Sequence, residues 1–133
     1  MGYFRPIGGQ ILFEATTTPT NPINLTMGVG AGGIPIAEPV TAYRVLIFDA
    51  ASSAEVHLAY GPSVAAVNAI AGAGGAPTAG SQTVGIITFG GVPATAGAGF
   101  LDYIVLPSNC FISVWCPVGS ADVYITPGQE TAH

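Results

Sequence analysis

The sequence predicts an all-β fold: an antiparallel, jelly-roll-like two-sheet sandwich of about eight strands. Short apolar runs rich in β-branched and aromatic residues recur along the 133 residues, and turn-forming residues separate them. The chain also contains 19 glycines and 11 prolines but only two Lys or Arg residues, so charged helix formers are nearly absent. We therefore expect a single β-sandwich domain over residues 1–133, with short N-terminal and C-terminal arms.

In the first half of the chain, alternating apolar side chains predict strands at residues 10–16, 23–29, 43–48 and 55–60. The last two of these are expected to form a hairpin across the Asp- and Ser-containing residues 49–54. A short helix is expected over residues 63–71, with Ser63 as its N-cap. Its apolar residues at helical spacing are Val64, Val67 and Ile70.

The last third of the chain contains three apolar runs, 101–106, 110–116 and 121–126, which follow a further predicted strand at 83–89. Pro-Ser-Asn and Pro-Val-Gly-Ser separate the three runs, and such short breaks predict an antiparallel meander. Both faces of the middle run are largely apolar, so we expect a central strand, with Trp115 as a core anchor. Residues 128–133 are expected to form a polar tail, and residues 72–80 and 90–99 to form Gly/Ala/Pro-rich loops.

The charge content indicates what kind of surface this chain has. Charged residues make up 7% of the sequence, against a typical value of about 25%. A chain of this mass exposes roughly 6,400 Å², so its formal charges lie about 700 Å² apart. A surface with so few charges favours a protein that works inside an assembly, and a monomer coated with neutral polar residues is the alternative.

The net charge of −5 excludes several classes of partner. Two arginines and no lysine cannot neutralise a run of phosphates, so neither nucleic acid nor an anionic membrane is an expected partner. No apolar run approaches the roughly 20 residues of a membrane-spanning helix, and the N-terminus lacks the apolar core of a signal peptide. We expect synthesis in a cytoplasm without secretion.

Two motifs resemble ligand sites without meeting their requirements. Residues 28–33 match G-x-G-x-x-G, but Pro35 and Pro39 follow where a dinucleotide site requires a helix, so a flexible bend is expected. Cys110 and Cys116 lie about 20 Å apart if they share one strand, too far for a disulfide between them. The chain has only two histidines, which makes a four-ligand zinc site unexpected.

One short segment contains the residue types of a hydrolase triad: Asp49, Ser52, Ser53 and His57. A nucleophilic serine requires a strained, supported turn and an oxyanion hole, and the sequence signals neither. The two serines fit a turn, and His57 shares a predicted strand face with Glu55, which suggests a solvated pair. The sequence therefore predicts no enzyme and no catalytic, cofactor-binding or metal-binding residue.

A resemblance to a known group is carried by the end of the chain. Residues 111–115, the following Gly-Ser turn, and residues 121–129 resemble the ending of many small virion proteins of tailed bacteriophages, and residues 43–60 are similar to the same group. The resemblance implies a capsid decoration (cement) protein or another small head or tail component, without a cofactor and located in the virion. Its implied partners are the major capsid protein or other virion subunits, together with further copies of itself in a homo-oligomer.

A second function remains open: a carbohydrate- or receptor-binding β-sandwich of a phage tail or fibre. Such sites place exposed aromatic residues with Asp and Asn in loops. Here the aromatic residues fall mostly within predicted strands, while the long loops consist of Gly, Ala and Pro. This distribution favours assembly over sugar binding, but it leaves head and tail locations equally open.

Overall fold

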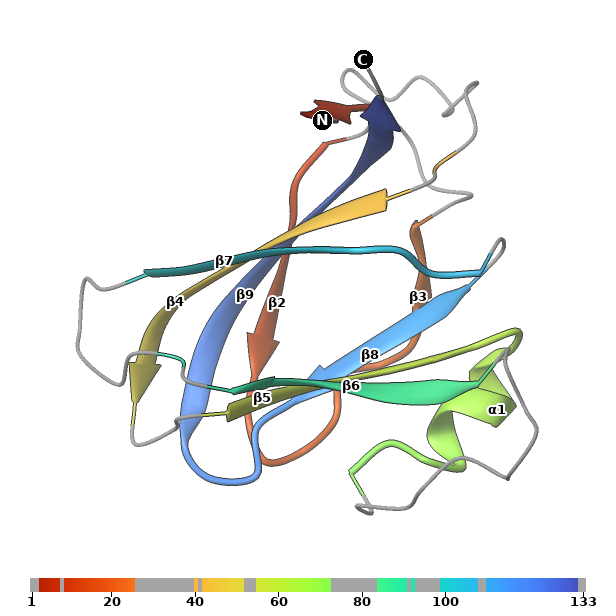
Figure 1. The fold of residues 1–133 in the computed structure, drawn as a ribbon. Coiled ribbons are helices and arrows are strands. Elements are labelled where there is room, and N and C mark those ends of the chain that lie inside the picture. The colour runs from red at the N-terminus through yellow and green to blue at the C-terminus, as the bar shows by residue number, and fades with distance from the viewer. Residues whose placement is uncertain are drawn as a thin grey trace.

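The computed structural model describes residues 3–7, 9–25, 40, 42–51, 55–72, 84–90, 92, 99–107 and 110–131. It confirms an antiparallel two-sheet sandwich (Figure 1). The described residues form nine strands: β1 Tyr3–Pro6, β2 Ile11–Ala15, β3 Ile23–Asn24, β4 Ala42–Ala51, β5 Glu55–Gly61, β6 Gly85–Gly90, β7 Gly99–Ile104, β8 Phe111–Trp115 and β9 Ser120–Thr131. They also form one short helix, α1 Val64–Asn68.

The strand order is that of a jelly roll. The five-stranded sheet has β7, β4 and β9 side by side, and the far edge of β9 pairs with β2 near its start and with β1 near its end. The four-stranded sheet has the order β3-β8-β5-β6. From β2 onward the chain crosses to the other sheet at every connection except β5 to β6, as in two successive Greek keys.

Two sequence predictions about strand pairing are wrong. Residues 43–48 and 55–60 form strands but not a hairpin, because β4 pairs with β7 and β9 while β5 pairs with β6 and β8 in the other sheet. The three C-terminal runs do not form a meander either, since β8 lies in the four-stranded sheet and β4 separates β7 from β9. A turn-rich break is compatible with a hairpin or with a connection between sheets, and burial of the apolar faces decides between them.

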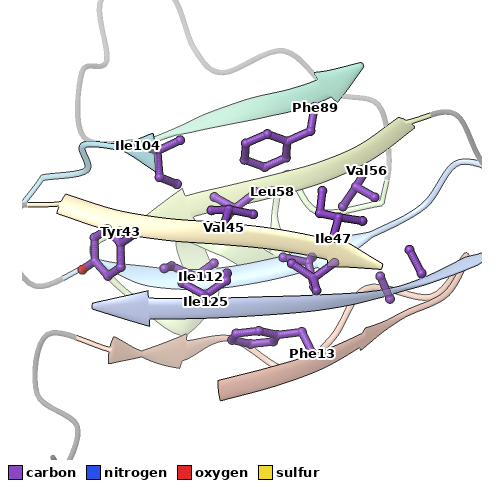
Figure 2. Packing of buried hydrophobic residues seen from close by; sticks show 14 of the residues in the cluster. Phe13, Tyr43, Val45, Ile47, Val56, Leu58, Phe89, Ile104, Ile112 and Ile125 are labelled. Carbon is purple, nitrogen blue, oxygen red and sulfur yellow. The ribbon is translucent and has the colours of Figure 1, made fainter. Parts of the chain in front are cut away.

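The core lies between the two sheets (Figure 2). Val45 and Ile47 of β4 point inward toward Val56 and Leu58 of β5, so strands expected to pair side by side pack face to face instead. The predicted faces of the middle C-terminal run are confirmed: its inward side joins this cluster through Cys110, Ile112, Val114 and Cys116. That strand, β8, is central as predicted, with β3 and β5 on its two edges.

The chain ends pair with each other. The polar tail expected over residues 128–133 is wrong for residues 128–131, because β9 continues to Thr131 and its last four residues pair with β1, while residues 132–133 lie outside the described residues. Arg5 Nη2 donates a hydrogen bond of 2.7 Å to Gln129 Oε1 within this ladder, and Figure 1 shows both termini at the same end of the sandwich. Gly128 is required here, since a β-carbon would collide with the Arg5 carbonyl oxygen and the Phe4 ring. The arms are therefore held within the chain.

The predicted helix is confirmed in a shorter form. Ser63 is its N-cap, and its hydroxyl accepts a hydrogen bond of 3.1 Å from the Ala66 amide. Val67 is buried against the outer face of the four-stranded sheet, where Trp115 is 4% exposed, but Val64 is exposed. Trp115 is thus buried as expected, although it packs under the helix rather than between the sheets.

Two further sequence features fall partly or wholly outside the described residues. The strand expected at 23–29 is confirmed only as β3, and the remainder from residue 26 lies outside them. The glycine-rich segment 28–33 and most of the two Gly/Ala/Pro-rich loops also lie outside them.

Both cysteines should be free thiols that are protected by folding. Cys110 and Cys116 form no disulfide and are buried, and burial raises the pKa of the Cys110 thiol, which suppresses its reactive thiolate. Alkylation of protein denatured without reductant should add two groups by mass spectrometry, whereas native protein should react far more slowly. Denatured protein that takes up no group would contradict the assignment.

Burial should also make the fold sensitive to alkaline pH. Burial raises the pKa of the Tyr43 hydroxyl above its usual value of about 10, and the nearby Cys110 raises it further. A raised pKa stabilises the fold below the unfolded-state pKa, and this contribution is lost as pH rises through the folded-state value. Between about pH 10 and about pH 11, the wild type should therefore lose up to about 1.4 kcal/mol of unfolding free energy that Tyr43→Phe does not lose. Equal losses in urea titrations would show that Tyr43 ionises freely in the folded state.

Candidate interaction face

His57 is the one proposed triad member whose surroundings the structure shows. Ser52 and Ser53 lie outside the described residues, and the Asp49 side chain is not described. The His57 ring stacks on Trp115 at 5.4 Å, and its Nε2 lies 3.6 Å from Glu55 Oε2, so the expected pairing with Glu55 is confirmed.

Thr88 is a neighbour of His57 that the sequence analysis missed. The register of β5 and β6 places Thr88 directly opposite His57, and its Oγ1 lies 2.9 Å from His57 Nδ1. The Thr88 hydroxyl, the Glu55 carboxylate and the Trp115 ring fix the imidazole in one orientation on the outer face of the four-stranded sheet. Strand alternation alone could have placed Thr88 on this face, but only the pairing register brings it to His57.

The described residues contain no group of three or more His, Cys, Asp or Glu side chains that could hold a metal ion. Within the same ranges, no helix combines the length and the apolar run that a membrane span requires. The feature that stands out is instead a sheet face.

The outer face of the five-stranded sheet has an apolar row across its centre. The cross-strand register aligns Leu12 with Tyr124, Tyr124 with Leu46, and Leu46 with Leu101. We call these four residues, from β2, β9, β4 and β7, the apolar row. Leu12 is 44% exposed and Leu101 is 52% exposed, while the two central residues are half-buried. Outward positions of a solvated sheet are ordinarily polar, so this row is unusual for a free surface.

One side of the apolar row is acidic. Glu14 lies opposite Asp122, and Asp122 lies opposite Phe48. The Phe48 ring meets Tyr124 edge-on at 6.2 Å and lies over Gly99, where a β-carbon would collide with it. This acidic flank therefore consists of two carboxylates beside an aromatic ring that contacts the apolar row.

The other side of the apolar row is cationic and aromatic. The register places Arg44 between Thr126 and Tyr103, and the Arg44 guanidinium carbon lies 5.7 Å from the centre of the Phe4 ring. Phe4 also contacts Tyr103, with ring centres 5.5 Å apart. Arg44 Nε and Thr126 Oγ1 are buried without a hydrogen-bond partner. This basic flank thus combines a cation, exposed aromatic surface and unsatisfied polar atoms.

The two outer faces of the sandwich differ in what covers them. On the four-stranded sheet, α1 packs over Ala59 and Trp115. On the five-stranded sheet, Leu12, Leu101 and Tyr103 remain 44%, 52% and 51% exposed. The outer face of the five-stranded sheet therefore presents apolar side chains to solvent.

The apolar row should be dispensable for folding. Leu101→Thr places a β-branched strand former at an exposed site, so the unfolding free energy should change by no more than about 0.5 kcal/mol. The buried control Leu58→Ala should lose about 2–5 kcal/mol. Urea titration at low protein concentration, where association does not contribute, measures both. A loss at Leu101 equal to that at Leu58 would place Leu101 in the core rather than on a contact surface.

The comparisons with known proteins leave function to be argued from this face. The chain matches no protein-family model, no curated protein and no solved structure in these comparisons.

Proposed function

We propose that this chain is a structural virion protein of a tailed bacteriophage, a decoration (cement) protein that stabilises the head through protein–protein contacts. The observation that carries the proposal is the uncovered apolar row on a chain with only 7% charged residues. An enzyme or a nucleic-acid binder would not require such a face, whereas a subunit of an assembly would.

The size of the face favours many weak contacts over one tight contact. Burying a whole Leu or Val side chain contributes about 1.5–3 kcal/mol, and the residues of the row are already partly covered. Association costs an estimated 4–15 kcal/mol of lost freedom, so this row alone supports only modest affinity. Repeated contacts among neighbouring subunits on a shell would convert such affinities into stable attachment.

The edge of the five-stranded sheet supports contact through the face rather than by strand addition. Asp102 of the edge strand β7 lies opposite the buried Val45, on the inward-facing side of the register. Asp102 is itself exposed, and a charged side chain on an edge strand discourages pairing with another chain. The jelly roll by itself does not distinguish capsid from lectin functions, so the surface must decide between them.

The alternative, carbohydrate or receptor binding by a tail or fibre, has one supporting observation. Tyr103 is 51% exposed beside Arg44, as in sites where a ring stacks on a sugar. Trp115, the only tryptophan and the strongest stacking platform, is buried and therefore argues against sugar binding.

Rebinding to stripped particles tests the proposal. The protein should return to purified shells in stoichiometric amounts and raise the shell melting temperature, with little dependence on salt because few charges are available. Leu12→Thr/Leu101→Thr should weaken rebinding, whereas Val118→Thr, an exposed apolar residue in the turn before β9, should not. A handful of copies bound at a tail or vertex would exclude decoration, and a glycan ligand would favour the alternative.

A further inference from the structure

Charges of opposite sign flank the apolar row, and they are unpaired within the part of the chain that the structure describes. Arg44 contacts the Phe4 ring, and neither Arg44 nor Asp122 has an ion-pair partner there. Because Asp122 lies opposite Phe48, four residues along β4 from Arg44, about 14 Å separates the two charges along the strands. This distance is too long for an ion pair within one chain.

The two charges are arranged symmetrically about the centre of the apolar row. Leu46 lies midway between Phe48 and Arg44 on β4, and its partner Tyr124 lies midway between Asp122 and Thr126 on β9. A twofold axis in the plane of the interface, passing between Leu46 and Tyr124, therefore exchanges the acidic flank with the basic flank. A second copy placed by this axis lays its apolar row across the first.

We propose that a second copy of this chain covers the outer face of the five-stranded sheet, in a twofold dimer in which Asp122 pairs with Arg44 of the partner subunit and Arg44 with Asp122 of the partner subunit. This inference deepens the proposed function, since it rests on this face acting in protein–protein contact and names its occupant. A twofold interface requires a self-complementary patch, and the face meets that requirement in both apolar contact and charge.

The chemistry of the basic flank supports a carboxylate as its partner. Arg44 is half-buried, its guanidinium carbon lies 5.7 Å from the Phe4 ring, and the register places the exposed Tyr103 beside it. A carboxylate accepts strong charge-assisted hydrogen bonds from a guanidinium, so an approaching acidic side chain suits the accessible part of Arg44. Glu14, opposite Asp122, adds a second negative charge to the flank that would approach Arg44 of the partner subunit.

Charge exchange tests the dimer directly. In sedimentation velocity over a concentration series, the wild type should be a dimer, whereas Arg44→Asp and Asp122→Arg should each raise the dissociation constant at least tenfold. An equal mixture of the two variants should form a heterodimer, because both of its cross-interface pairs are again of opposite sign. The double variant Arg44→Asp/Asp122→Arg should recover the homodimer for the same reason.

The control is Arg5→Asp, which makes the same charge change on the other side of β1 and should leave the dimer intact.

A second measurement avoids substituting the half-buried arginine. Leu46→Cys lies beside the proposed axis, and because stacked sheets lie about 10 Å apart, a short bismaleimide should crosslink it between subunits, whereas it should not crosslink Val118→Cys. Crosslinking is read on denaturing gels, where the native buried cysteines provide the background.

A wild-type protein that stays monomeric, a variant mixture that stays monomeric, or Leu46→Cys that does not crosslink would each overturn the inference. These outcomes are separable from those for the proposed function. A monomer that still rebinds to shells would remove the dimer and leave decoration standing. A dimer that never binds particles would support the dimer and exclude decoration.

Discussion

Strand β9 is the element on which the rest of the structure depends, because it is hydrogen-bonded along both edges. It pairs with β4 on one side and with β2 and then β1 on the other, so it joins the earliest strands of the chain to the middle of the sheet. Its inward side chains Val123 and Ile125 are fully buried in the core. Its outward Tyr124 occupies the centre of the apolar row, so a single strand couples the core to the proposed contact surface.

The inner and outer faces of the two sheets contribute differently to stability and to association. The inward faces of both sheets supply a closed apolar core, and the minor cluster under α1 covers much of the outer face of the other sheet. No described helix packs on the outer face of the five-stranded sheet, and this face carries one of the only two arginines in the chain. A surface with so few charges depends on shape, apolar contact and a small number of well-placed ion pairs, which is why Arg44 and Asp122 matter more here than on an ordinary charged surface.

The few titratable side chains of the sandwich are held differently on its two outer faces. His57 is held by Thr88, Glu55 and the Trp115 ring, so one of the few titratable side chains is fixed in position on the covered sheet. On the outer face of the five-stranded sheet, Arg44 contacts the Phe4 ring and has no ion-pair partner among the described residues. The proposed dimer would supply that partner as a carboxylate of the second copy.

The sequence by itself determined the local properties: the fold class, the strand segments, their inward faces, the Ser63 cap and the free cysteines. Each of these follows from the side-chain period and from turn chemistry, which act over a few residues. Strand partners were decided only in three dimensions, because alternation shows which side of a strand is apolar but not which edge it pairs with. The apolar row required the register of four strands, and the β1–β9 ladder joins Arg5 to Gln129 across 124 residues. The hairpin and meander predictions failed for this reason: face-to-face packing buries both apolar faces of the sandwich, a gain that no local pattern can encode.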